Sequence, residues 1–419
     1  MLKNLYAVFI FFIFLAIYYA GSFTKIPFAD CVGFVLDAEK GKWITTSTAT
    51  THFLYINTVI FIKNLTGLSA IEASRLVVIF SGAATVSIIY LTVKCLTKKE
   101  WPSITAAFVF GFSFSFWRNA EIVEVYTYNS LWLSLFFFSM IKTFIEKKKN
   151  YIFLSGLFLG ISLWVHIQNI LLIPAFLIFL FYFRNEKKMV LGSILIFGFL
   201  FSSLFILNIS QGLSFNSVYN SEHGNWVEDS FKKTFLQYVK DFFGSFAYLI
   251  YNFNAFIFFG ITGVILLYGS NRKMFFVFLT GSVCVYGFST FYAVSDNYVF
   301  FLAFNIIFAL SIGYGLAVPK YDHLKKFTWV CLLIPFGYLM AYKMALLTEK
   351  GREIHAFKQH KGGLNYYMLP WMNDNVGILE FTIDKRTAPE PVHWMVTSAR
   401  EYIELLKSKG YTEEEIKKL

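Results

Sequence analysis

The sequence predicts an all-α polytopic membrane protein with about eleven transmembrane helices, a long first outer loop and a small extracytoplasmic tail. Of its 419 residues, 57% are hydrophobic and only 15% are charged, whereas about 25% are charged in a typical soluble domain. Apolar runs of about 18 to 22 residues recur, and each matches a hydrocarbon core of about 30 Å. Because backbone groups in lipid must be paired within their own segment, we expect the runs to be helices.

The predicted spans follow one another along most of the chain. They lie at about 5–22, 74–96, 101–117, 129–145, 151–167, 170–184, 189–208, 245–269, 274–294, 298–318 and 327–346. The first run shows no convincing cleavage signal, and we expect it to remain as the first helix.

The positions of the basic residues predict which side of the membrane each end of these spans faces. The net charge is +11, but lysines and arginines lie at the ends of apolar runs, so we do not expect a nucleic-acid partner. They occupy every second connection, among them Lys3, Lys98, Lys148, Arg272 and Lys320. The positive-inside rule then places the N-terminus in the cytoplasm and the C-terminus outside.

The outer face is expected to carry the longer connections. In the first loop, "DCVGFVLDAEKGKW" and "THFLYINTVIFIKNL" have apolar residues at helical spacing but are too short to span, so they predict interfacial helices. We divide the chain into a membrane domain at 1–346 and a tail at 347–419. In the tail, "TSAREYIELLKSKG" predicts an amphipathic helix ending at Gly410, and "TEEE" a second short helix. We expect the tail to dock on the outer loops.

Cysteine usage bears on the compartment. The four cysteines have neither CxxC spacing nor a disulfide framework, which excludes a disulfide-rich scaffold and gives no zinc signature. Together with the compact outer loops, this favours a bacterial inner membrane, with the outer face toward the periplasm or exterior.

Polar residues next to apolar runs are the first place to seek function, because charge near lipid is costly unless it is paired or solvated. They gather on the predicted outer side. The residues selected as candidates are Asp30, His52, Arg75, Arg118, Glu121, Glu124, Tyr126, His166 and Asp296.

Each candidate also has an ordinary explanation. Arg75 fits an interface anchor as well as a ligand. His166 fits a hydrogen-bonded packing residue, and Glu121 fits a side chain that faces water. For Glu124 a functional and an ordinary structural explanation have equal weight, because it lies in a short, half-apolar segment.

Several motifs resemble those of the protein O-mannosyltransferase-like family of the GT-C glycosyltransferase superfamily. "FWRNAEIVEVYTYNSLW" resembles the family's segment around its "EVY" motif. "FADCVGFVLDAEKG" is similar to its aspartate loop, "THFLY" to its "HPpgyPLY", and "SRLVVIFSGAAT" to its "aRlvsalfgalt". The resemblance covers roughly the first 145 residues, with a fainter match at "SDNYVFFLAFNIIFALSIGYG".

The resemblance implies a GT-C fold and a polyprenyl-phosphate-sugar-dependent hexosyltransferase that inverts the anomeric centre. It implies transfer of a mannose-like sugar to a hydroxyl of a protein, lipid or glycan, with Asp30 as the base. Arg75 and Arg118 would hold the phosphate, since arginine binds phosphate in a bidentate manner. The remaining candidates would contact substrate: Glu121, Glu124, Tyr126, His52, His166 and Asp296. We expect no cofactor and no metal.

Two other functions remain open. A transporter or flippase of lipid-linked sugars would place its ligands near the bilayer midplane on related repeats, and neither signal is found in the sequence. A membrane scaffold that presents the tail would leave Asp30 and the segment around Glu124 unexplained.

Overall fold

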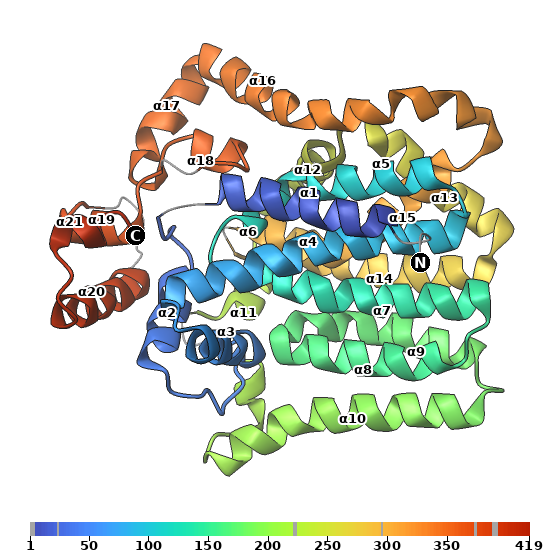
Figure 1. Cartoon of the computed structure of the whole chain (residues 1–419), viewed down its shortest axis with the longest axis horizontal. Helices are drawn as coiled ribbons and strands as arrows, with labels where there is room; N and C mark the ends of the chain where they lie inside the picture. The colour runs from blue at the N-terminus through green and yellow to red at the C-terminus, as the bar shows by residue number, and fades with distance from the viewer. Residues whose placement is uncertain (1–4, 23–24, 221–223, 295, 373–374, 388–392) are drawn as a thin grey trace.

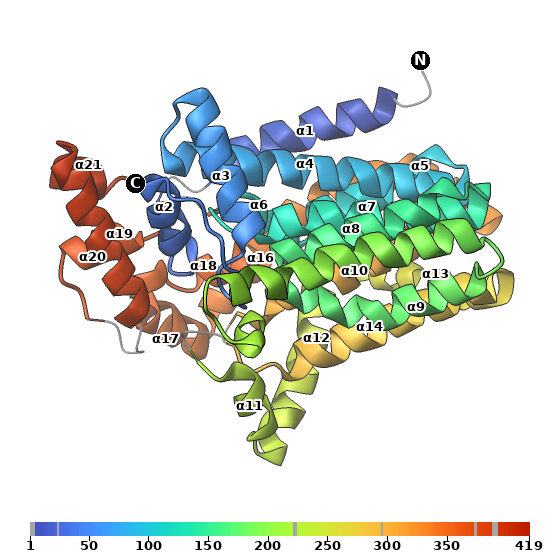
Figure 2. The same cartoon turned by 90° about the horizontal axis from the view of Figure 1, so that it is seen from below.

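The structure is a computed structural model that describes residues 5–22, 25–220, 224–294, 296–372, 375–387 and 393–419. Within these ranges the regular elements are all helices. Most of them run side by side along the long axis of the molecule, while the C-terminal helices form a separate group at one end (Figure 1). The first turn of α1 lies toward the opposite end (Figure 2). The connections between α4 and α5, α7 and α8, and α9 and α10, whose sequences are rich in lysine and arginine, lie at that end as well.

Each of the eleven predicted runs falls mostly on helix, although the run at 101–117 is interrupted at Phe112 and Ser113. The helices of the bundle are α1 (Leu5–Gly21), α4 (Ala70–Thr97), α5 (Glu100–Gly111), α6 (Phe114–Ala120), α7 (Tyr126–Glu146), α8 (Asn150–Val165), η2 (Ile167–Leu172), α9 (Ile173–Tyr182), α10 (Lys187–Ser210), α13 (Ile257–Ser270), α14 (Arg272–Phe291), η5 (Asn297–Phe301), α15 (Leu302–Leu316), η6 (Pro319–Leu333) and α16 (Ile334–Leu347). Among the described residues, six helical segments, one of which is divided at Asn254, are long and apolar enough to cross a membrane. The full count of eleven spans stays a prediction.

The span predicted at 245–269 is not one straight helix. It is divided at Asn254, whose backbone has φ 48° and ψ −135°, a region that non-glycine residues rarely adopt. Before the break, α12 (Phe235–Phe253) runs across the axis of the bundle; after η4 (Asn254–Phe256), α13 runs along it (Figure 2). Phe235 and Phe243 of α12 are 83% and 65% exposed, as expected for a helix with an apolar face toward lipid.

The outer loops and the tail form the helices at the other end. They are α2 (Cys31–Lys40), α3 (Phe53–Thr66), η3 (Phe215–Val218), α11 (Trp226–Phe231), α17 (Glu349–Phe357), η7 (Gln359–Lys361), α18 (Asn365–Met368), α19 (Ile378–Ile383), α20 (His393–Ser408) and α21 (Glu413–Ile416). Both predicted tail helices are present. Gly410 has φ +92° just after α20, and the predicted capping box forms between Thr412 and Glu415.

The tail docks on the first loop, as predicted. One buried cluster joins Val35 of α2 and Ile56 of α3 to Tyr402 and Leu406 of α20. Burying such side chains is worth about 1.5–3 kcal/mol each, so this contact is a strong one. It holds the tail over the end of the bundle, where the candidate residues lie.

Candidate active site

A cavity of about 1050 Å³ lies where the end of the bundle meets the first loop and the tail. Its wall comes mainly from the first loop, α6 with the turn that follows it and the start of α7, η2, the segment between α14 and α15, and the tail. Residues of α12, of α14 and of the segment between α10 and α12 complete it. Seven of the nine candidate residues line it, namely Asp30, His52, Arg118, Glu124, Tyr126, His166 and Asp296. The fold therefore brings together side chains that are up to 266 positions apart in the sequence.

Asp30 stands immediately before α2. Aspartate at this position usually caps a helix by accepting hydrogen bonds from its first N–H groups, but the Asp30 side chain forms no such bond. Its backbone oxygen instead accepts from the N–H of Phe34, at 3.1 Å. The carboxyl group therefore lines the cavity and does not cap the helix.

Glu124 lies beside Asp30, in the tight turn between α6 and α7. One carboxylate oxygen accepts from the backbone N–H of Val125 at 3.1 Å, and the other accepts from Sγ of Cys31 at 3.4 Å. Cys31 directly follows Asp30, so these contacts join the first loop to the turn. Glu124 is 4% exposed, and burial together with the charge of Asp30 raises its pKa well above the usual value.

Asp296 adds a third carboxyl group from the segment between α14 and η5. Burial raises its pKa, which the positive charges of Lys361 and Arg118 partly offset. Burial and the negative charge of Asp296 raise the pKa of Asp30 to about 7. A carboxyl group with such a pKa exchanges protons readily near neutral pH.

Arg118 is the main buried cation in this wall. It is 2% exposed, and its Nε donates to the hydroxyl of Tyr298 at 3.0 Å. A terminal nitrogen donates to the backbone oxygen of Tyr366 in the tail, and the guanidinium carbon lies 3.9 Å from the centre of the Tyr366 ring. These contacts fix the orientation of the positive charge in the cavity.

His52 and His166 form an adjacent pair, with ring centres 4.8 Å apart. Nδ1 of His52 lies 2.9 Å from the backbone oxygen of Val165, so this nitrogen carries the proton. Nδ1 of His166 accepts from the N–H of Gln168 at 3.3 Å, which leaves the proton of a neutral ring on Nε2. Burial lowers the pKa of His52 to about 4, so that ring is neutral at physiological pH. The ring of Tyr126 lies 5.9 Å from that of His166 and extends the same wall.

Two predicted site residues lie outside the cavity lining. Nε of Arg75 donates to Oγ of Ser22 at 2.9 Å, and its guanidinium carbon lies 5.9 Å from the ring of Tyr19 on α1. This position fits the interface-anchor interpretation and provides no support for phosphate binding by Arg75.

Glu121 is also away from the cavity, but it does not face water. It is 1% exposed, and one of its oxygens accepts from the indole N–H of Trp117. Burial raises its pKa well above the usual value, which favours the neutral form. It packs so closely against α1 that a Cβ at Gly21 would lie 2.0 Å from its carboxyl oxygen, so Glu121 is placed as a packing residue.

The sequence reasoning missed the contribution of the tail. Lys358, Lys361, Tyr366 and Tyr367 line the cavity, and all lie within "KQHKGGLNYY", directly after the last apolar run and α17. A basic and aromatic stretch next to a predicted span is a signal for contact with an anionic group. We expect only docking from the tail on the basis of sequence, and these side chains add to the predicted site.

The sequence also matches a known family over part of its length. Residues 43–190 match the family described as the Protein O-mannosyl-transferase TMEM260 N-terminal domain. The match includes Arg118, Glu124 and His166, but it begins after Asp30 and ends before Asp296. The resemblance to O-mannosyltransferase-like GT-C proteins is confirmed.

Two solved structures of ArnT from Cupriavidus metallidurans share this fold. The apo structure is 13% identical with a TM-score of 0.56, covering 82% of this chain and 64% of that one. The structure bound to undecaprenyl phosphate is 11% identical with a TM-score of 0.56, covering 96% of this chain and 76% of that one. At these identities the likeness concerns the fold. A comparison with curated proteins gives no significant match.

The protein is therefore a multi-pass integral membrane protein. Its fold is shared with ArnT over most of its length, and its apolar helices are long enough to cross a bilayer. It spans slightly less than two thirds of the apo ArnT chain.

Proposed function

We propose that the chain is a membrane glycosyltransferase that moves a mannose-like sugar from a polyprenyl-phosphate donor to an acceptor hydroxyl. The observation that carries this proposal is the pairing of a proton acceptor and a buried cation in one cavity. Asp30 and Arg118 both line it, and they have the charges that the two ends of such a reaction require. The family match and the ArnT structure with undecaprenyl phosphate support the choice of donor.

The reaction begins with the acceptor hydroxyl, whose pKa is too high for it to attack unaided. The carboxylate of Asp30 accepts its proton as the acceptor oxygen forms a bond to the anomeric carbon. The bond from that carbon to the phosphate oxygen breaks on the opposite face, so the anomeric configuration inverts. The leaving polyprenyl phosphate keeps the electron pair.

The leaving phosphate needs positive charge, because its own charge rises from about −1 to about −2 as the bond breaks. Arg118 supplies that charge from a fixed position, since Tyr298 and the tail backbone hold its guanidinium group. An interaction that strengthens as the bond breaks stabilises the transition state more than the bound donor. We therefore propose that transfer requires neither a cofactor nor a metal.

The sugar hydroxyls are bound by the neighbouring polar wall. Nε2 of His52 is a free acceptor and Nε2–H of His166 a donor in their neutral tautomers, so the pair suits hydroxyl groups, which both give and accept hydrogen bonds. Glu124 and Asp296 position the sugar or the acceptor, with Tyr126 as an apolar surface. We propose that the cavity faces the periplasm or exterior of a bacterial inner membrane.

The test uses purified full-length protein in nanodiscs with a panel of labelled polyprenyl-phosphate sugars and acceptor peptides, glycans and lipids. We expect one sugar to be transferred with inversion, as read by NMR of the product, and the rate to be unchanged by a chelator. Movement of a lipid-linked sugar across vesicle membranes without any transfer would replace this proposal with the flippase alternative. Transfer lost in the chelator and restored by a divalent cation would remove the metal-free part.

A further inference from the structure

The tail reaches the wall of the cavity at the same place as Arg118. Lys361 ends η7 and is half-buried there. Its surroundings contain the positive charges of Arg118 and Lys358 and the negative charge of Asp296. Burial, together with Lys358, lowers the pKa of Lys361 to about 8. Lys361 is therefore a second cation in the same wall.

The backbone after Lys361 sets where this side chain lies. Gly362 and Gly363 both have positive φ, +85° and +69°, a conformation that glycine adopts without strain. The turn is also crowded, because a Cβ at Gly362 would lie 2.6 Å from Cβ of Asn375. The N–H of Leu364 donates to Nδ1 of His355 at 2.9 Å, which ties the turn to α17. Lys361 thus stands at the start of a tight, well-anchored turn.

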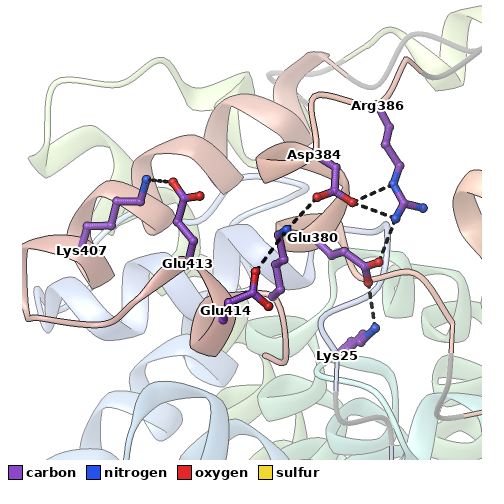
Figure 3. Close-up of polar contacts among 8 residues, drawn as sticks. Lys25, Glu380, Asp384, Arg386, Lys407, Glu413 and Glu414 are labelled. Carbon is purple, nitrogen blue, oxygen red and sulfur yellow. Dashed lines mark hydrogen bonds and ion pairs between the residues drawn. The ribbon is translucent and has the colours of Figure 1, made fainter.

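The far part of the tail holds the loop that carries Asp30. Nζ of Lys25 pairs with Glu380 at 2.8 Å, and Glu380 pairs with Arg386 at 2.9 Å (Figure 3). The backbone of Ile26 joins the same contact: its N–H donates to the oxygen of Leu419 at 2.6 Å, and its oxygen accepts from Ile378 at 2.9 Å. The tail therefore contacts both the loop that carries Asp30 and, through Tyr366, the guanidinium group of Arg118.

We propose that Lys361 is a phosphate-binding residue that acts with Arg118, so that the C-terminal tail completes the donor site. This inference rests on the proposed function and names the residue that recognises the phosphate of its donor. Arg118 offers a rigid, planar set of donors, whereas Lys361 offers three donors on a flexible stem. Such a pair can follow the phosphate as its charge grows during bond cleavage.

A purely structural role for Lys361 has a different signature. If the lysine only balances Asp296, its loss affects the stability of the fold and leaves affinity for a phosphate unchanged. If it binds phosphate, its loss weakens binding while the fold persists. The two roles are separated by measuring binding and thermal unfolding on the same variants.

The experiment measures binding of undecaprenyl phosphate to the full-length protein in nanodiscs. We expect Lys361→Gln to weaken binding at least about tenfold, the size of one charge-assisted hydrogen bond, and Lys361→Arg to keep most of it. Lys350→Gln is the matched control, because Lys350 lies on α17 with a side chain 79% exposed; it should bind like the unmodified protein. A folded Lys361→Gln variant with unchanged affinity overturns the proposal.

A pH series keeps the test decisive if Lys361→Gln does not fold. Binding by the unmodified protein should weaken as pH rises from 7 to 9, because Lys361 loses its proton near pH 8 while the phosphate stays a dianion. Ionisation of Asp30 near pH 7 contributes a part of this dependence that does not involve Lys361. Lys361→Arg should therefore flatten the profile between pH 8 and 9, where Asp30 is already ionised, and an identical pH dependence in both proteins refutes the role of Lys361. If the unmodified protein does not bind undecaprenyl phosphate at all, the proposed function fails together with this inference.

Discussion

The ionisation of Asp30 should control the rate of transfer. Asp30→Asn preserves the size of the side chain but removes its basicity, so we expect turnover to fall by about 10²- to 10⁴-fold, the usual contribution of a general base. The fold should persist, because the Asp30 side chain neither caps α2 nor pairs with a cation in the described structure. Asp322→Asn is the control: Asp322 is exposed and pairs with Lys99 at 2.6 Å, in the connections at the N-terminal end.

The pH dependence follows from the raised pKa of about 7. A carboxyl group with this pKa is about 10% ionised at pH 6 and about 90% ionised at pH 8. Because only the ionised form accepts the proton, kcat/KM should rise about tenfold between these two values. Activity is thus present above pH 7 and is lost as the pH falls through 7.

A substitution at Asp296 offers a second way to change the pKa of the Asp30 carboxyl group. Its negative charge is one of the two causes of the raised pKa of Asp30, so Asp296→Asn should lower that pKa and move the rising limb of the profile to lower pH. The limb should disappear in the residual activity of Asp30→Asn. These two results would show that the pH dependence comes from the ionisation of Asp30 and not from a general loss of active enzyme in acid.

The assay is initial-rate transfer from the labelled donor between pH 5 and 9 in nanodiscs, with thermal unfolding measured at each pH. The reasoning is refuted if Asp30→Asn transfers sugar at the rate of the unmodified protein. It is also refuted if Asp296→Asn leaves the profile in place, since the electrostatic coupling would then be absent.

Three further predictions test the remaining site and the topology. Glu124→Gln should raise KM more than it lowers kcat, since its carboxylate positions substrate; an equal loss of turnover to that of Asp30→Asn would leave the base unassigned between the two. Arg118→Lys should weaken undecaprenyl phosphate binding severalfold while Arg75→Lys leaves it unchanged, and the reverse order would return the phosphate site to α4. An impermeant maleimide added from outside should label a cysteine at Glu404 but not one at Lys148, with the parent chain as control; labelling of 148 alone would invert the topology.

The sequence was sufficient for the features that depend on local composition. The apolar runs became helices because lipid leaves a backbone no other way to satisfy its hydrogen bonds. The helices of the first loop and of the tail followed from apolar spacing and from the capping box at Thr412. The "EVY" segment indicated a resemblance that the family match at residues 43–190 includes, whereas the acidic loop lies before the matched residues.

Other features depended on contacts between distant segments. Arg75 and Arg118 look alike in sequence, since each is a cation beside a predicted span, but only the packed helices decide which one faces the cavity. The break at Asn254, which turns α12 across the bundle, also has no strong local signal such as proline.

The composition of the cavity wall was decided by tertiary structure alone. Tyr366 contacts Arg118 and Lys361 lines the same wall because the tail lies over the end of the bundle, where its later helices α19 and α20 pack against the first loop. The pKa of Asp30 depends on a carboxyl group 266 positions away, brought close by that same packing. Hydrophobic periodicity reports which face of a helix is buried, but it does not encode which distant side chain will share that buried space, and the electrostatics of the site are set by those neighbours.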